Sequence, residues 1–418
     1  MPSRYAKLLR ALLTAALILV LAAVSGAASA GPLEDALAAN EKGDHATALR
    51  LIRPLAEQGS ADAQYNLGIM YFLGQGMPRD VAEAAKWFRR AADQGDATAQ
   101  YNLGAMSFSG AGVPQNYGEA AKWYGLAAKQ GYTDAQFNLG VVYQRGDGVA
   151  QNFGEAIRWF RLAADQGYAP AQYNLGLMFG KGQGVPQDFA EAIKWLRLAA
   201  AQGEADAQYS LGLRYHNGDG RAKDYSEAMK WFRLAADQGH VDASSSLGAM
   251  YSLGQGVAQN YVEGLKWFRL AADRGNAKGQ FNLGVMYEHG DGVPQDYGEA
   301  LKWYRLAANQ GDALAQINLG VMSRDGKGEA KNYAEAMQWF RLAADQGLAL
   351  AQFNLGLMYA NGLGPQDYVQ SHMWLSLSAA QGIQDAAKNR ELVERYMTAA
   401  QIAQARDLVR DWKPKAVQ

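Results

Sequence analysis

The chain has 418 residues, and its 40 basic side chains are balanced by 41 acidic ones. The absence of cysteine excludes disulfides, thiolate metal sites, a cysteine nucleophile and a lipoprotein anchor on an N-terminal cysteine. The near-zero net charge gives no indication of a nucleic-acid partner.

Residues 1–30 follow the three-part plan of a secretory signal peptide. Basic side chains come first, then an apolar run, then small residues: Arg4, Lys7 and Arg10, residues 12–24, and Ala28-Ser29-Ala30. We predict cleavage between Ala30 and Gly31, and hence a periplasmic or secreted chain with no integral membrane span. Cleavage removes three positive charges from a net charge of −1 and leaves −4. The alternative is an uncleaved N-terminal anchor, although the apolar run is shorter than the ~20 residues that a span prefers.

Residues 31–59 predict an irregular helix hairpin, which extends from about Leu33 to Gln58 and turns at Gly43-Asp44. This segment lacks the Leu-Gly pair and the tryptophan that recur after it. We therefore expect it to cap the N-terminal end of the array that follows.

Residues 60–382 repeat one pattern nine times with a period of 36 residues. The glycine of a Leu-Gly pair marks every unit, at Gly68, Gly104, Gly140, Gly176, Gly212, Gly248, Gly284, Gly320 and Gly356. A tryptophan keeps the same phase, at Trp87, Trp123, Trp159, Trp195, Trp231, Trp267, Trp303 and Trp339, and at Trp374 one residue early. Such a period is typical of units that bury their apolar faces only by stacking on neighbours. We number the units modules one to nine.

The sequence of module one, residues 60–95, predicts two helices. Apolar residues at helical spacing indicate a first helix over about residues 60–73, and the glycines and proline of residues 74–78 end it. Asp80 and Glu83 then have the spacing of a capping box, in which Asp80 accepts a backbone N–H and Glu83 bonds back to the start of the helix.

Small residues mark the contacts that we expect between helices. Gly68 lies in mid-helix, where glycine costs about 1 kcal/mol relative to alanine, so its recurrence predicts a closely facing helix. Ala91-Ala92 offers a second small surface, and Trp87 fills the space beside it. Gln94-Gly95 ends the second helix in a left-handed conformation.

Residues 383–418 depart from the repeat and predict two closing helices. The first continues to about Met397, and Thr398 with Gln401 forms a capping box for the second. The apolar residues of the second helix share one face: Ile402, Ala405, Val409 and Trp412. Charged residues on these helices would cover the last apolar layer of the array.

The repeated unit resembles the Sel-one-like repeat, a branch of the tetratricopeptide-like helical repeats. The motifs that carry the resemblance are Ala-x-x-x-Leu-Gly-x-x-Tyr, Gly-x-Gly-Val-x-x-Asp/Asn-Tyr and Ala-x-x-Trp-Phe/Tyr-x-x-Ala-Ala-x-x-Gly, over residues 60–382. The resemblance implies an all-α, right-handed α-solenoid of stacked helix hairpins whose first helices line a concave groove. It also implies an adaptor or scaffold for protein or peptide partners. Some exported relatives carry a disulfide in each repeat, and this chain departs from them.

A row of asparagines follows the outer stripe of the first helices and is our candidate partner-binding surface. Its members are Asn66, Asn102, Asn138, Asn174, Asn282, Asn318 and Asn354, with serine in modules five and six. An amide can both donate to and accept from the backbone of an extended peptide. The alternative is that the row bonds only to neighbouring helices and holds their curvature.

We expect modules four to six to hold the specificity patch, near Lys181, Arg214 and His216. Lys181, Arg214 and His216 could meet an acidic partner segment. The alternative is simple decay of the repeat. Module six has Ser244-Ser245-Ser246 in place of Gln-Tyr-Asn, so we expect the array to open first there.

Nothing in the sequence indicates catalysis, and we expect neither an enzyme nor a cofactor. The five histidines share no metal-binding spacing and no recognisable triad. The Gly-x-Gly loops follow helices, not strands, and therefore indicate turns and not a phosphate site. The alternative functions are a cell-envelope hydrolase or cell-wall-ligand-binding protein, and a secreted factor that acts on another cell.

Overall fold

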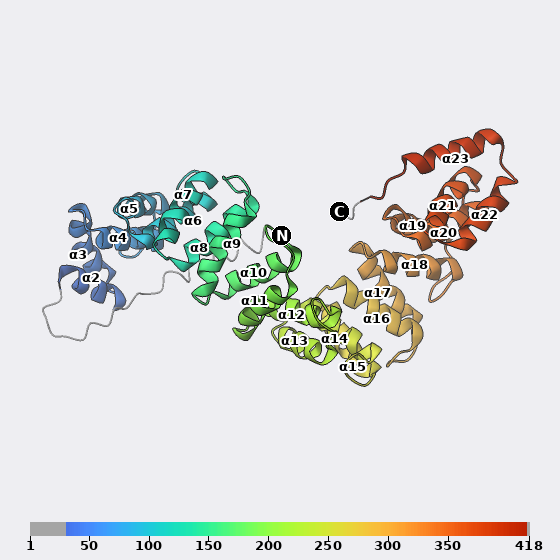
Figure 1. Ribbon diagram of the computed structural model, residues 1–418, viewed down its shortest axis with the longest axis horizontal. Helices are drawn as coiled ribbons and strands as arrows, with labels where there is room; N and C mark the ends of the chain where they lie inside the picture. Colours follow the sequence, from blue (N-terminus) through green and yellow to red (C-terminus); the bar gives the residue numbers. More distant parts are fainter. Residues whose placement is uncertain (1–30, 416–418) are drawn as a thin grey trace. The chain divides into compact units, whose positions relative to one another are not determined.

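The computed structural model describes residues 31–415, so the predicted signal peptide lies outside the described residues. The described part contains 22 helices and no strand, which confirms the all-α prediction (Figure 1). None of these helices is long and apolar enough to cross a membrane. The helices form two compact units, one ending at Ala207 and one starting at Gln208.

The first unit holds an N-terminal hairpin and modules one to four. Within modules one to four the two helices pack on each other, and in modules one to three the second helix also packs on the first helix of the next module. The helices are α2 (Pro32–Glu41), α3 (His45–Glu57), α4 (Ala61–Leu73), α5 (Val81–Asp93), α6 (Ala97–Ser109), α7 (Tyr117–Lys129), α8 (Thr133–Arg145), α9 (Phe153–Asp165), α10 (Ala169–Lys181) and α11 (Phe189–Ala201).

The second unit begins within the first helix of module five and extends through the closing helices. Modules six to nine pack as those of the first unit do. The helices are α12 (Ala205–Asn217), α13 (Tyr225–Asp237), α14 (Val241–Leu253), α15 (Tyr261–Asp273), α16 (Ala277–His289), α17 (Tyr297–Asn309), α18 (Ala313–Asp325), α19 (Tyr333–Asp345), α20 (Ala349–Ala360), α21 (Tyr368–Ala380), α22 (Gln384–Glu394) and α23 (Ala399–Asp411).

Half of the predicted capping box forms in module one. Asp80 Oδ1 accepts the backbone N–H groups of Ala82 at 3.0 Å and Glu83 at 2.9 Å. The predicted return bond from Glu83 is wrong, because its carboxylate pairs with Lys86 Nζ at 2.7 Å. A cation one turn along the helix offers the carboxylate a stronger partner than a neutral backbone N–H. A complete capping box forms where it was predicted in α23, between Thr398 and Gln401.

The glycine in mid-helix faces a large side chain of its own module, as predicted. A Cβ atom on Gly68 would lie 2.8 Å from two ring carbons of Phe88, closer than Cβ atoms approach other atoms in proteins. The side chains that take the place of Phe88 in the other modules are Tyr124, Phe160, Leu196, Phe232, Phe268, Tyr304, Phe340 and Leu375. Each module therefore closes its hairpin over one glycine.

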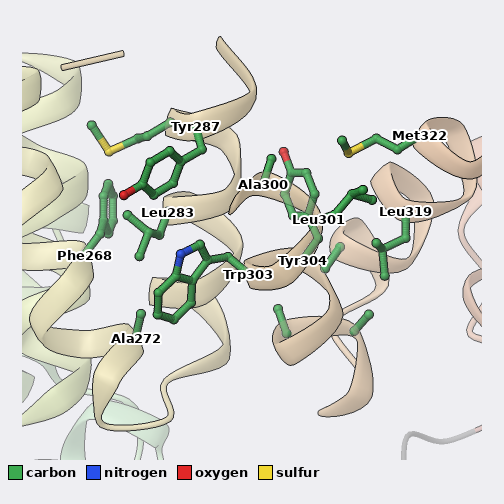
Figure 2. Close-up of a cluster of buried hydrophobic side chains, with 14 residues drawn as sticks. Phe268, Ala272, Leu283, Tyr287, Ala300, Leu301, Trp303, Tyr304, Leu319 and Met322 are labelled. Carbon is green, nitrogen blue, oxygen red and sulfur yellow. The ribbon is translucent and has the colours of Figure 1, made fainter. Parts of the chain in front are cut away.

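The tryptophans fill the seams between modules. Trp123 clusters with Ala91 and Ala92 of the preceding module, so the small alanine pair is the seat of the next tryptophan. Figure 2 shows the same arrangement later in the chain, with Trp303 beside Ala272 of module six. Removing such a buried side chain leaves a cavity that the array cannot refill.

A ladder of buried glutamines, which the sequence analysis missed, links the same seams. Gln100 Nε2 donates to the backbone oxygen of Ala92 in the preceding module at 3.0 Å, and Gln130 Nε2 donates to Gln100 Oε1 at 2.8 Å. The glutamine pair recurs in eight of the nine modules. Module six lacks both members, because Ser244 and Arg274 take their places.

The closing helices do not form a tenth hairpin of the usual kind. Helix α22 packs on α21 as the first helix of a new module would, but α23 packs on α21 and not on α22. Trp412, which follows α23, meets Trp374 edge to face at 6.2 Å. Beyond it, Lys415 Nζ pairs with Asp345 Oδ2 at 2.8 Å. The chain thus folds back over the last tryptophan seam.

Candidate interaction surface and terminal cavity

One position is exposed in every module: the last residue of the first helix in modules one to eight, and the residue directly after α20 in module nine. We call these positions the Leu73 row: Leu73, Ser109, Arg145, Lys181, Asn217, Leu253, His289, Asp325 and Asn361. Their side chains range from apolar to acidic and basic, whereas the seams beneath them repeat the same residues. Exposure without a fixed residue type is what a surface for one particular partner requires.

The asparagine row is partly engaged within the chain. Asn66, Asn174 and Asn282 each donate an amide hydrogen to the carbonyl oxygen four residues earlier in their own helix, at 2.8 Å. Asn354 does the same, and its oxygen also accepts from Arg324 at 2.9 Å. These bonds favour a structural role, but the oxygens of the first three remain available to a partner.

The other asparagines of the row bond to tyrosines. Burial raises the pKa of Tyr65 to about 12, and a hydrogen bond from Asn102 offsets part of that rise. Asn138 plays the same part for Tyr101, and Asn318 for Tyr304, whose pKa values burial also raises. These tyrosines therefore stay protonated at neutral pH.

The three predicted specificity residues differ in their surroundings. Lys181 ends α10 in the first unit, is exposed, and has no ion pair among the described residues. Arg214 is paired with Asp219, its NH1 atom lying 2.6 Å from Oδ2. His216 Nε2 lies 3.0 Å from Gln255 Oε1, and its ring meets Tyr225 edge to face. Only Lys181 thus offers an uncompensated charge, and the specificity prediction stays a prediction.

A polar cavity lies in the second unit where α21, α22 and α23 meet. Its volume is about 510 Å³, and its lining residues are His372, Ser376, Arg390, Glu391, Glu394, Arg406 and Val409. His372 is only 2% exposed, and its Nε2 lies 2.8 Å from Glu394 Oε1. Ser376 Oγ lies 3.4 Å from His372 Nδ1.

The sequence did not predict this cavity, because each of its residues alone is an ordinary departure from the repeat. The sequence analysis found no metal-binding spacing and no triad among the five histidines, and it did not single out His372, which is buried. The signal lies in the register: His372 stands where module one has Ala85, and Arg390 stands where it has Leu67. Two apolar core positions that become ionisable together indicate a polar site.

Among the described residues, no group of three or more histidine, cysteine, aspartate or glutamate side chains could hold a metal ion. Two histidines outside the cavity, His45 and His240, have local partners. His45 Nδ1 lies 2.7 Å from Asn40 Oδ1, and His240 stacks on Tyr209 with ring centroids 4.5 Å apart.

The repeat identifies the relatives of this chain. The Sel1 repeat family matches nine consecutive segments, residues 61–96, 97–132, 133–168, 169–204, 205–240, 241–276, 277–312, 313–348 and 349–383. The chain is similar to c5321, a protective antigen of uropathogenic Escherichia coli with an SLR fold, at 33% identity over 91% of either chain and a TM-score of 0.62. It is also similar to a Sel1 repeat protein of Oxalobacter formigenes, at 34% identity over 74% of this chain and 90% of that one, with a TM-score of 0.63. No curated protein sequence matches it.

Proposed function

Because the chain belongs to the Sel1 repeat family, whose members generally mediate protein–protein interactions, we propose that it is an exported scaffold. Its first helices bind a protein or peptide partner through the Leu73 row and the free oxygens of the asparagine row. The Sel1 scaffold is generally non-catalytic, and binding alone accounts for the surface described above.

The observation that carries this proposal is the contrast between the seams and the Leu73 row. Every seam tryptophan and nearly every glutamine pair repeats, so the modules are interchangeable inside. The Leu73 row is exposed in all nine modules and presents seven residue types. A surface that served only to hold the stack would need no such variety. A surface that recognises a partner of defined sequence needs a different residue at each contact.

Charge on this row suggests the chemistry of the partner. Lys181 is exposed and unpaired among the described residues, so an acidic partner residue would gain a contact there without breaking one. Arg214 would first have to leave Asp219. We therefore expect Lys181→Glu to weaken partner binding more than Arg214→Glu does.

Site-specific photocross-linking in envelope extract tests the surface. Leu73 on α4 and Leu162 on α9 are 43% and 41% exposed, so they are matched in type and exposure but lie on a first and a second helix. A photoreactive phenylalanine analogue at position 73 should give a discrete adduct that the analogue at position 162 does not. Adducts only from position 162 would move the binding surface to the second helices.

Export rests on the pattern of residues 1–30 and is tested separately. Small residues at positions 28 and 30 suit a signal peptidase, so changing Ala28 and Ala30 to leucine should block processing. The mature N-terminus, read by mass spectrometry of the periplasmic and medium fractions, should begin at Gly31 in the parent. A parent chain that keeps residues 1–30 in the membrane fraction would favour the uncleaved anchor.

One observation favours a hydrolase as the second candidate. Ser376, His372 and Glu394 lie in the order of a serine–histidine–carboxylate triad, with Ser376 and Glu394 at opposite ring nitrogens. The 3.4 Å separation of Ser376 Oγ from His372 Nδ1 is long for an activated nucleophile. A fluorophosphonate probe should leave Ser376 unlabelled. Labelling that Ser376→Ala abolishes would establish a hydrolase instead.

A further inference from the structure

The terminal cavity exists because α22 has the register of a first helix but not its core. Asp385-Ala386 aligns with Asp62-Ala63, and Asn389 donates to Asp385 O at 2.8 Å as Asn66 does to Asp62 O. In this register Arg390 replaces Leu67 and Glu391 replaces Gly68.

Those two replacements remove the seat of a second helix. Glycine is needed at the Gly68 position because a large side chain of the second helix lies against it. Glu391 cannot accept such a contact, and α23 lies on α21 instead. The space that a second helix fills elsewhere is left as the cavity of about 510 Å³.

The cavity presents two guanidinium groups with unused hydrogen-bond donors. Arg390 Nε is buried and has no hydrogen-bond partner, although it lies 3.8 Å from Glu394 Oε1. Arg406, on the opposite wall, has neither a hydrogen bond nor an ion pair among the described residues. The Arg390 Nε–H group is removed from water without a partner, which is costly, and a bound anion would relieve that cost. Arg406 is exposed and offers its charge to the same anion.

The remaining polar groups hold the wall in place. Glu394 accepts or shares a proton with His372 Nε2 at 2.8 Å, which ties α22 to α21. The carboxylate of Glu394 is therefore committed to His372 and does not close a hydrogen bond with Arg390. Glu391 is exposed at the rim and has no partner among the described residues.

We propose that this cavity binds a carboxylate, held by Arg390 and Arg406, at the end of a small molecule or of a peptide chain. A planar carboxylate matches the fork of a guanidinium group, and bidentate pairing gives both strength and orientation. The volume of about 510 Å³ leaves room for an amino acid or for the last few residues of a peptide. Glu391 at the rim favours a ligand that also carries an ammonium group or a backbone N–H.

Calorimetric titration of the full chain with three probes tests the proposal. N-acetyl-alanyl-alanine should bind, and its C-terminal amide should bind at least about tenfold more weakly, because the amide lacks the charge. Free alanine separates the two sources of the carboxylate. Tighter binding of alanine than of the acetylated dipeptide indicates a small-molecule site, and the reverse indicates a peptide end. Equal binding of the acid and its amide, or no binding of any carboxylate, overturns the proposal.

Variants of one helix give the matched control. Arg406→Gln should weaken binding of the acid by about tenfold or more, whereas Arg410→Gln should not, because Arg410 lies outside the cavity and pairs with Asp407 and Asp411. Arg406 is exposed, so its replacement leaves the fold intact, which an unchanged thermal midpoint checks. Equal losses in both variants would show a nonspecific charge effect and overturn the site. That failure would leave the proposal for the Leu73 row untouched.

Discussion

Modules six and seven share one backbone pattern but are held to the preceding module in different ways. In module seven, Gln280 Nε2 donates to Ala272 O at 3.2 Å and Gln280 Oε1 accepts from Gln310 at 2.7 Å. In module six, Ser244 Oγ reaches only His240 O, in its own module, at 3.4 Å. The comparison shows that apolar stacking and the polar tie between modules are separable.

Module six keeps contacts nearer the surface with the preceding module. His240 stacks on Tyr209, and Arg274 donates to Gly239 O at 3.2 Å. Exposed bonds of this kind compete with water and stabilise less than buried ones. We therefore still expect α14 to show the faster hydrogen exchange, and slower exchange in α14 than in α16 would contradict that expectation.

Among the variants considered, replacing a seam tryptophan should cause the largest loss of local stability. Trp303 is 6% exposed and bonds to Glu299 Oε2 at 3.0 Å, so Trp303→Ala should cost about 3–5 kcal/mol of local stability. Trp267 in module six is only half-buried, so Trp267→Ala should cost less stability. Hydrogen exchange resolved by module measures both losses. Equal losses would mean that the two seams do not differ in packing.

Alkaline pH should destabilise module one more than module six, because module one has Tyr65 where module six has Ser245. The folded-state pKa of Tyr65 is about 12 against an ordinary value of 10.0. Tyr65 thus contributes stability that is complete below pH 10 and is lost as the pH rises from 10 to 12, by up to about 3 kcal/mol.

Thermal unfolding of Tyr65→Phe at several pH values measures this contribution. The variant should lose less stability than the parent between pH 10 and 12. Tyr396→Phe is the control, because it removes the same hydroxyl from a side chain that is 70% exposed. If the stability of the parent and of the Tyr65→Phe variant fell in parallel with pH, Tyr65 would not be the source of the alkaline destabilisation.

Sequence alone predicted the parts of the fold that depend on near neighbours in the chain. Helix boundaries, the left-handed Gly95 and the contact at Gly68 follow from periodicity and local sterics. The partner of Glu83 could not be predicted in this way. Several donors lie within reach of its carboxylate, and only the three-dimensional geometry shows that it pairs with Lys86 and not with the backbone. Repetition, clear in the sequence, does not show which glutamine meets which carbonyl oxygen.

The candidate surfaces were predicted less completely than the fold, for the same reason. The Leu73 row could be located by helical phase, since position 73 follows Ile69 by four residues and Asn66 by seven, on the outer stripe of the first helix. The cavity could not, because His372 and Glu394 are 22 residues apart and meet only after α22 has packed on α21. An alignment of α22 with the first helices would have found Arg390 and Glu391 as replacements of core residues.

Removing the polar tie of module seven should have an intermediate effect. Gln280→Ala deprives Ala272 O and the Gln310 amide of their buried partner, which should cost about 1–2 kcal/mol. Module-resolved hydrogen exchange should then show α16 approaching the protection of α14. The control is Gln295→Ala, because Gln295 is exposed and bonds only at the inter-helix loop. Equal effects of the two variants would mean that the buried ladder adds nothing to the seam.

The smallest effect should come from building the ladder where it is missing. Ser244→Gln with Arg274→Gln restores both members of the pair in module six, with Ala236 O as the expected acceptor by analogy with Ala272 O. A net hydrogen bond contributes about 0.5–1.5 kcal/mol, and the long glutamine side chains lose rotamer freedom on burial, so the gain should lie near the lower end. Either single variant leaves an amide without its partner and should gain nothing or lose stability. A double variant that equals the sum of its singles would show that the two glutamines do not act as a pair, and the ladder would then be a set of independent bonds.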